Sequence, residues 1–437
     1  MSHVTVIRNA RHWKTGEPID LAFQRGVILE GAPASADVTV DAGGAILSPG
    51  LVDLHVHLRE PGQGSRETIE TGTRAAAAGG FTAVACMPNT EPVVDNIAWV
   101  EWVRTRARAM ASCRVLPIAA VTIGQKGERL TEMIALKQAG AVALSDDGHP
   151  IVSAATMRHA LEYACHAGLP IVCHEEDPAL KGDGHMNEGT LATRLGIRGI
   201  PAAAESVMVR RDVELAELTG GRVHLAHLSC SASFEGLREA KRRGLAVTGE
   251  TCPHYWMLTE DAVAERGTAA KMNPPLRTER DRAATIAAIQ DGTIDCLATD
   301  HAPHGEDDKR QPFEMAPFGI VGLETALALT ITGLVRAGHV TLPWALQLWT
   351  EGPRRVFHLP EVRLAAGFPA DLTLIDAERE WVVDPEAFHS KGRSTPFAGM
   401  RVTGRALATW CAGELTHADP SLPIAGRRSE REGAALA

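Results

Sequence analysis

The sequence predicts a TIM-like (β/α)8 barrel with a small β-sandwich domain built from both chain ends, and three observations support this fold class. Eight short apolar runs recur through the middle of the 437 residues, and segments of helical composition lie between them. The runs are apolar throughout, which is typical of parallel strands buried on both faces. The two chain ends carry only short strand-like runs. A doubly wound open sheet is the alternative, but it would not bring the first and last strands together.

The eight expected barrel strands follow one another as β-then-α units. They are residues 51–58, 81–87, 115–122, 141–147, 170–175, 222–229, 245–251 and 295–300. Helices are expected at residues 67–78, 128–138, 154–166, 202–218, 233–243 and 278–290. Several of these segments close with glycine, as at Gly79, Gly140 and Gly168, which suits a helix end before the next strand.

Short strands are expected near both ends of the chain, at residues 4–7, 21–29, 38–40, 371–375, 381–383 and 406–410. Neither set is large enough to bury a face alone, so we expect the two to combine beside the barrel. The predicted organisation is therefore residues 1–48 as the first part of the β-sandwich, 49–364 as the barrel, and 365–437 as the second part. Residues 420–437 are polar and are expected to form a loose tail.

Composition limits the classes of partner. The formal net charge is −10 and the isoelectric point is near 6.0, which argue against nucleic acid or an anionic membrane as the main partner. An anionic substrate would therefore need a local cationic site. The eight cysteines include no C-x-x-C pair, and the sequence has neither a signal-peptide pattern nor an apolar stretch of membrane-spanning length. We expect a cytoplasmic protein with reduced thiols.

Metal-ligand side chains close several of the expected strands. His55 and His57 are two residues apart on one strand, so both imidazoles project to the same side. In a parallel barrel all C-terminal strand ends meet at one face. The side chains that fall there are His55, His57, Asp147, His174, His227 and Asp300. Imidazoles with carboxylates suit Zn²⁺, with Mn²⁺, Co²⁺ or Fe²⁺ as alternatives, and six ligands indicate two metals that share a carboxylate.

Nine sequence strings resemble one family. They are DLHVHLREPG (53–62), GGFTAVACMPNT (79–90), LSDDG (144–148), CHEED (173–177), HLSC (227–230), ETCPHY (250–255), KMNPPLR (271–277), ATDHAPH (298–304) and GFPADLTLID (367–376). In this order they resemble the long-chain, class I dihydroorotases of the amidohydrolase superfamily. The resemblance covers nearly the whole chain.

The resemblance implies a role for each ligand. His55, His57 and Asp300 would hold the first zinc ion, and His174 with His227 would hold the second. Many amidohydrolases bridge the metals with a carboxylated lysine, but this chain offers an aspartate there. Asp146 and Asp147 point to opposite sides of a strand, so only one can face the metals, and the family pattern favours Asp147. Asp300 would also act as general base and acid.

The resemblance also implies a substrate site. Arg59, Asn89 and His304 would hold the substrate carboxylate, and the planar fork of Arg59 suits that group. Asn273 would contact the substrate ring, and Phe318 and Gly319 would offer backbone groups to it. Phe318 departs from the usual proline before this glycine, which need not matter if only main-chain atoms bind.

The implied activity is the reversible interconversion of L-dihydroorotate and N-carbamoyl-L-aspartate, in pyrimidine biosynthesis. The implied assembly is a homo-oligomer such as a dimer, with association with aspartate transcarbamoylase as a further partnership. Two alternatives remain. One is another cyclic-amide hydrolase, a hydantoinase or allantoinase, although these usually carry the bridging lysine and lack the arginine clamp. The other is an inactive structural partner of aspartate transcarbamoylase, although inactive relatives lose metal ligands.

Overall fold

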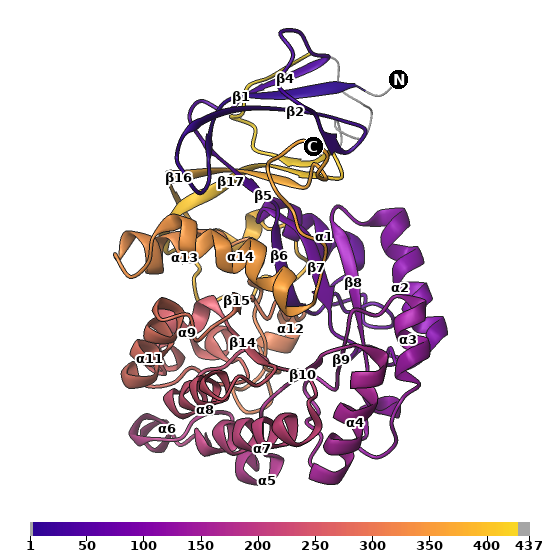
Figure 1. The fold of residues 1–437 in the computed structure, drawn as a ribbon. Helices are drawn as coiled ribbons and strands as arrows, with labels where there is room; N and C mark the ends of the chain where they lie inside the picture. The colour runs from indigo at the N-terminus through magenta and orange to yellow at the C-terminus, as the bar shows by residue number, and fades with distance from the viewer. Residues whose placement is uncertain (1–2, 427–437) are drawn as a thin grey trace.

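The computed structural model describes residues 3–426, and the central part of the molecule is a barrel of eight parallel strands (Figure 1). The strands pair in chain order around the barrel, and each overlaps one of the eight predicted runs. They are β6 (Leu51–Val56), β7 (Phe81–Cys86), β8 (Arg114–Ala119), β9 (Ala143–Ser145), β10 (Ile171–Cys173), β13 (Val223–Leu225), β14 (Val247–Thr251) and β15 (Cys296–Leu297). The predicted fold class is confirmed.

The first and last strands of the barrel meet through a short set of contacts. Val56 forms a parallel bridge with His301, and the His57 N–H donates to the His301 carbonyl at 2.8 Å. The buried Asp53 carboxylate accepts from the backbone N–H of Thr299 at 3.2 Å and from its hydroxyl at 2.6 Å. These contacts bring the end of β6 beside the segment that follows β15, as a functional site drawn from both strands requires.

Helices surround the barrel, and neighbouring helices contact each other around much of it (Figure 1). The longer ones are α1 (Ile69–Ala78), α2 (Ile97–Met110), α3 (Met133–Ala139), α4 (Ala154–Ala167), α7 (Ala203–Thr219), α8 (Ser231–Arg242), α11 (Glu279–Gln290) and α14 (Leu342–Val356). Gly140 and Gly168 end α3 and α4 with φ of 112° and 65°, as predicted. All six predicted helices are present, whereas α2 and α14 were not predicted.

Shorter elements lie in the connections. They are α5 (Pro178–Lys181), β11 (Met186–Asn187), α6 (Thr190–Leu195), β12 (Gly199–Ile200), α9 (Pro253–Met257), α10 (Asp261–Arg266), α12 (Glu306–Lys309) and α13 (Ala326–Thr330). Helices α5 and α6, with β11 and β12, fill the connection between β10 and α7. Helix α12 follows the last barrel strand, on the connection that carries Arg59's neighbours Pro303 and His304.

Strands from both chain ends form one branched sheet of nine strands above the barrel in Figure 1. They are β1 (Val4–His12), β2 (Pro18–Gln24), β3 (Val27–Ile28), β4 (Val38–Asp41), β5 (Ile46–Pro49), β16 (Leu372–Val382), β17 (Arg401–Cys411), β18 (Glu414–Ala418) and β19 (Ile424–Gly426). The antiparallel pairing of β5 with β16 joins the two ends of the chain. The sheet has its own core, in which the rings of Phe23 and Trp410 meet edge to face at 6.1 Å.

Two details of this sheet differ from the prediction. The expected strand 21–29 is divided into β2 and β3 by a turn at Arg25 and Gly26, which have φ of 52° and 75°. A side chain at Gly26 would meet the Ala412 carbonyl at 2.6 Å, so the turn requires glycine. The prediction of a loose tail at residues 420–437 is wrong for its first part, because residues 424–426 form β19, which pairs with β4. The rest of that tail, residues 427–437, lies outside the described residues.

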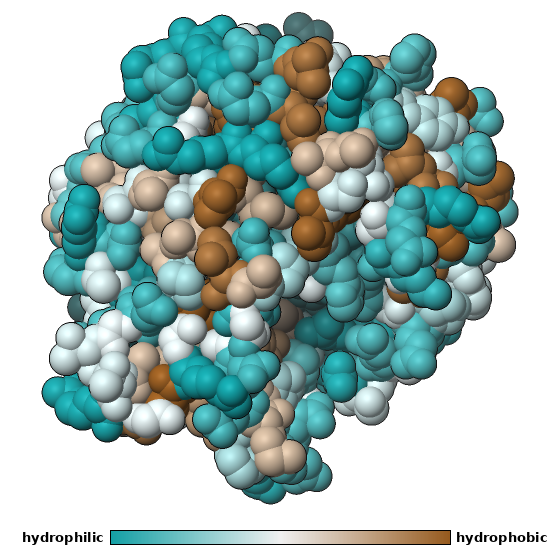
Figure 2. Space-filling model, turned by 90° about the horizontal axis from the view of Figure 1, so that it is seen from below, coloured by the Kyte–Doolittle hydropathy of each residue, from teal (hydrophilic) through white to brown (hydrophobic). Residues whose placement is uncertain are grey.

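Figure 2 views the molecule from below Figure 1. Hydrophobic side chains form small separate groups among hydrophilic ones on this face. Within residues 3–426, no helix has both the length and the apolar character needed to span a membrane.

Candidate active site

The six predicted ligand residues lie at the C-terminal ends of five barrel strands, and all are buried. β6 carries His55 and leads into His57, and the other four residues follow their strands by one to three positions. They are Asp147 after β9, His174 after β10, His227 after β13 and Asp300 after β15. Closure of the barrel therefore gathers side chains that are up to 245 positions apart in the chain.

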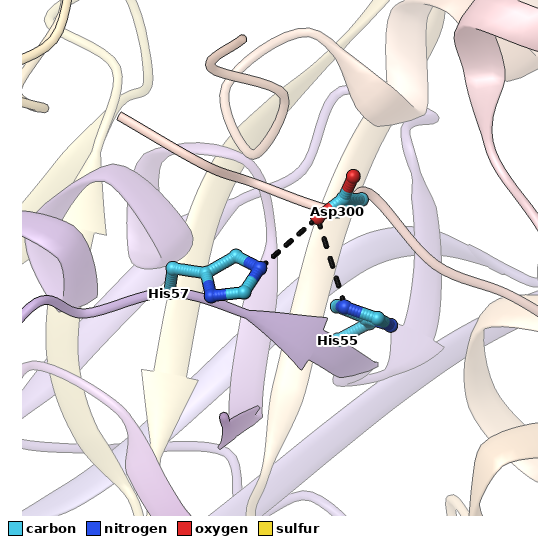
Figure 3. A group of neighbouring side chains, drawn as sticks. All are labelled: His55, His57 and Asp300. Carbon is cyan, nitrogen blue, oxygen red and sulfur yellow. Dashed lines mark hydrogen bonds and ion pairs between the residues drawn. The ribbon is translucent and has the colours of Figure 1, made fainter. Parts of the chain in front are cut away.

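The first group joins His55, His57 and Asp300 (Figure 3). Asp300 Oδ1 lies 3.2 Å from His57 Nε2 and 3.6 Å from His55 Nε2, so both rings point toward one carboxylate oxygen. Burial alone would raise the pKa of Asp300, but the contact with His57 and the charge of His55 lower it to about 2. The carboxylate is therefore ionised at neutral pH, as a metal ligand must be.

The second group is centred on Asp147. Its Oδ1 lies 3.4 Å from His55 Nε2, 3.6 Å from His174 Nδ1 and 3.7 Å from His227 Nε2. Its Oδ2 lies 3.6 Å from His57 Nε2. Asp147 thus contacts histidines of both predicted metal positions, which is the geometry expected of a bridging carboxylate.

The residues present fit a divalent metal. His55 Nδ1 lies 2.9 Å from Glu250 Oε1, which leaves Nε2 directed at the other ligands. Among the described residues, neither His55 Nε2 nor Asp147 Oδ1 has a hydrogen-bond partner, although both are buried. Buried polar atoms are normally satisfied, so a cation between these atoms would account for both. Imidazoles with carboxylates form the donor set that zinc and similar ions prefer.

Asp146 faces away from this cluster. Its carboxylate accepts from the Val121 N–H at 2.8 Å and the Thr122 N–H at 3.0 Å, at the end of the neighbouring strand β8. Burial raises the pKa of Asp146 to about 6. The structure thus brings Asp147 and not Asp146 to the other predicted ligand residues.

Alanine at Asp147 is expected to remove at least one equivalent of bound metal, because this carboxylate lies between the two groups. The Asp146→Ala variant should keep its metal and lose stability, since buried donors left unpaired cost about 1–3 kcal/mol each. Elemental analysis and thermal unfolding of both variants would test this. If only Asp146→Ala lost metal, the assignment of Asp147 as the ligand would be wrong.

Glu250, on strand β14, is a residue that sequence reasoning missed. Its two carboxylate oxygens lie 2.9 Å from His55 Nδ1 and 3.1 Å from His224 Nε2. Both histidines are buried, and their contacts hold the pKa of Glu250 well below its usual range despite its burial. A carboxylate on the outer nitrogen of a ligating histidine fixes the ring's orientation and tautomer. The only signal in the sequence was a glutamate at the end of an apolar run.

Arg59 provides the predicted cationic site. It is only 8% exposed, and its Nε donates to the Pro303 carbonyl at 3.2 Å. Its other polar contact is His304, and within the described part of the chain no carboxylate lies within ion-pair distance of it. Burial and the charge of Arg66 lower its pKa to about 10, so it stays protonated at neutral pH. A buried guanidinium without an acidic partner is a preformed site for an anion.

His304 lies beside Arg59 and cannot neutralise it. Burial and the charge of Arg59 lower the pKa of His304 to about 2, so the ring is neutral. Its Nε2 lies 2.7 Å from the Phe318 carbonyl, which can only accept, so this nitrogen carries the proton. Arg59 Nη2, at 3.3 Å from the same nitrogen, therefore finds no acceptor there.

The remaining predicted residues lie at the edges of these groups. Asn89 contacts His57 Nδ1 at 2.9 Å through its Oδ1 and donates to Asp147 Oδ2 at 3.3 Å. Asn273 Nδ2 lies 3.2 Å from His174 Nε2. The Gly319 N–H donates to the Lys271 carbonyl at 3.0 Å, so this backbone group already has a partner. The roles of Asn273, Phe318 and Gly319 toward a substrate ring stay predictions.

Backbone strain coincides with the site. Arg59, His227 and Asp300 have positive φ angles of 61°, 34° and 48°. Residues other than glycine rarely adopt this conformation, and it persists where the surrounding structure holds the side chain in place. Three strained residues in one cluster therefore support a functional role for this end of the barrel.

Comparisons with known proteins agree with this geometry. The family model described as "Dihydro-orotase-like" matches residues 44–233. A dihydroorotase of Desulforapulum autotrophicum is 52% identical over 379 residues, which cover 87% of this chain and 88% of the relative. A dihydroorotase of Anaeromyxobacter dehalogenans (strain 2CP-1) is 54% identical over 380 residues, covering 86% and 88%. The chain belongs to the dihydroorotase family. The resemblance of the sequence strings is thereby confirmed, and the chain is a cyclic amidohydrolase.

Solved structures show the same fold at lower identity. The L-hydantoinase (dihydropyrimidinase) of Arthrobacter aurescens superposes with a TM-score of 0.84 at 24% identity, covering 95% of this chain and 96% of that one. A D-hydantoinase superposes with a TM-score of 0.83 at 22% identity, covering 97% of both chains. The barrel and the added β domain are thus shared with the hydantoinases.

Proposed function

We propose that this protein is a metal-dependent dihydroorotase, which reversibly hydrolyses the ring amide of L-dihydroorotate to N-carbamoyl-L-aspartate. The observation that carries the proposal is the buried Arg59, without an acidic partner among the described residues, beside a cluster of six predicted metal-ligand side chains. Dihydroorotate brings the carboxylate that Arg59 lacks. A neutral hydantoin would leave the guanidinium buried and unpaired, which is costly.

The metal would be held by this chain's histidines and aspartates. We propose two zinc ions, one held by His55, His57 and Asp300 and one by His174 and His227, with Asp147 shared between them. When bound, such ions supply Lewis acidity that activates water and polarises the ring carbonyl. Glu250 supports the site by fixing the His55 ring, and Asn89 does so through His57.

Asp300 is the proposed proton carrier. It would accept the proton of the attacking water and deliver it to the departing ring nitrogen. A carboxylate with a pKa of about 2 is a weak base, so its contribution depends on position. The contact with His57 at 3.2 Å and the strained backbone hold Asp300 in that position.

Arg59, Asn89 and His304 are the proposed contacts of the substrate carboxylate. The terminal amino groups of Arg59 can bind both oxygens in a bidentate pair. His304 Nδ1 has no hydrogen-bond partner within residues 3–426, and a bound carboxylate would favour a proton on this nitrogen, which could then donate to it. Asn89 links this end to Asp147. Asn273, Phe318 and Gly319 would contact the ring.

The cellular setting is proposed from the substrate, the cysteines and the family resemblance. A role in pyrimidine biosynthesis follows from the proposed substrate. All eight cysteines are free thiols, which suits the cytoplasm. A homodimer and an association with aspartate transcarbamoylase rest on the family resemblance. A purely structural partner role is disfavoured, because the full ligand set is present.

A direct assay tests the proposed function. The purified, metal-loaded protein should open dihydroorotate and close N-carbamoyl-L-aspartate, with a much lower kcat/KM on the neutral rings dihydrouracil and hydantoin. Metal content should be measured on the same sample by elemental analysis. Comparable efficiency on neutral rings would favour the hydantoinase alternative, and a loaded but inactive protein would favour a structural role.

A further inference from the structure

Two buried lysines hold the segment that carries Phe318 and Gly319. Lys271, in KMNPPLR, is 2% exposed, and Lys309, at the end of α12, is 6% exposed. Neither forms an ion pair with a carboxylate among the described residues; both ammonium groups donate mainly to backbone carbonyls. Burying a cation without a carboxylate partner is unfavourable, so the arrangement needs an explanation beyond packing.

Lys309 binds the backbone on both sides of Phe318. Its Nζ donates to the Pro317 carbonyl at 3.0 Å and to the Gly319 carbonyl at 2.9 Å, and also to the Lys271 carbonyl at 3.2 Å. The carbonyl between these two, that of Phe318, is the one that His304 Nε2 contacts at 2.7 Å. Lys309 therefore fixes the orientation of the peptide group on which His304 depends.

Lys271 holds the beginning of the same segment. Its Nζ donates to the carbonyls of Phe313 and Ala316, both at 2.6 Å. It also lies 4.6 Å from the centre of the Phe318 ring, and Lys181 lies 5.1 Å from that ring. Cations over an aromatic face are attracted to it. The Phe318 side chain is thereby held as well.

The protonation of His304 links this support to Arg59. While Nε2 donates to the Phe318 carbonyl, it offers no lone pair to Arg59 Nη2, 3.3 Å away. If that carbonyl turned away, His304 could place its proton on Nδ1 and accept from Arg59 through Nε2. The guanidinium would then be partly occupied by the protein itself and less available for a substrate carboxylate.

We propose that Lys309 is a positioning residue that keeps Arg59 free for the substrate carboxylate, by fixing the Phe318 peptide and with it the protonation of His304. This inference rests on the proposed function. Lys309 does not touch the substrate, but it would contribute to the preference for anionic over neutral rings.

The test uses the full-length, metal-loaded enzyme with Lys309→Met, which keeps an unbranched side chain one atom shorter and removes its donors. KM for dihydroorotate and for N-carbamoyl-L-aspartate should rise about tenfold to a hundredfold, because a partly occupied guanidinium loses part of its charge-assisted pair with the substrate carboxylate. Metal content should not change, and kcat should fall much less than KM rises. Lys309→Gln, which keeps amide donors, should restore part of the affinity.

A control for the loss of a lysine donor is Lys241→Met. Lys241 also donates to a backbone carbonyl, that of Gly292 at 3.1 Å, but it lies on the outside of the barrel in α8 and forms an ion pair with Asp295 at 2.8 Å. Its loss should leave KM unchanged. A double-mutant cycle gives a second readout: in a His304→Ala background, Lys309→Gln should change KM no further, because Lys309 acts through His304.

The outcomes separate the two proposals. A wild-type enzyme without activity on dihydroorotate would overturn the proposed function and this inference together. An active wild type, with KM unchanged in both Lys309 variants, would overturn the inference alone. The inference would also be overturned if Lys309→Gln raised KM by the same factor in the wild type and in the His304→Ala background. If Lys309→Met does not fold, Lys309→Gln and the double-mutant cycle with His304→Ala still test the inference.

Discussion

Alanine at His55 is expected to abolish metal binding and dihydroorotate hydrolysis together. His55 lies in both groups of predicted ligand residues, since its Nε2 lies 3.4 Å from Asp147 and 3.6 Å from Asp300. Loss of an outer partner of a ligating histidine already costs about 10- to 100-fold in affinity or activity, so loss of the ligand itself should cost more. Elemental analysis and kcat measured on the same preparation check this.

Cys173→Ser is the control for this prediction. Cys173 precedes His174 in the sequence and is buried. Its burial is the main cause that raises the pKa of its thiol well above the usual value. A protonated thiol is a poor metal ligand, so the variant should keep both metal and activity. A His55→Ala enzyme with metal bound and full activity would refute the ligand assignment.

The barrel could be predicted because its strands carry a local signal. Each is a short apolar run followed by a polar side chain, and this pattern survives although β15 spans only Cys296–Leu297. Helix α14 was missed because Gly352 and Pro353 lie inside it, and these residues normally interrupt a helix. Helix α2 was missed because only Val100 and Val103 of its fourteen residues are buried.

The site was predictable to the extent that its residues close strands. His55 and Asp300 meet because the barrel closes, which the fold class implies. Glu250 was not predictable in this way, because its contact with His55 spans 195 positions and joins two strands that are not neighbours. Lys309 gave no signal, since its acceptors are backbone carbonyls, which every residue has. Such supporting contacts need the three-dimensional structure.

Arg59→Ala is expected to lower kcat/KM on dihydroorotate severely while metal content stays normal. Truncating one partner of a buried charge pair costs about 2–5 kcal/mol, or about 30- to 5,000-fold. Part of that loss comes from leaving the substrate carboxylate unpaired in a dry pocket. Arg59→Lys should recover little, because an ammonium group lacks the planar fork that binds two oxygens. Steady-state kinetics with metal analysis on each variant provide the measurement.

Two comparisons make this last prediction specific to the carboxylate. Arg66→Ala removes a neighbouring cation that lies 3.5 Å from Asp308 and is partly exposed, so kcat/KM should change little. The weak hydrolysis of neutral dihydrouracil should survive Arg59→Ala, because that ring has no carboxylate to lose. If Arg59→Ala retained wild-type efficiency on dihydroorotate, or lost both substrates equally, Arg59 would be a structural residue. The preference for an anionic ring would then need another source.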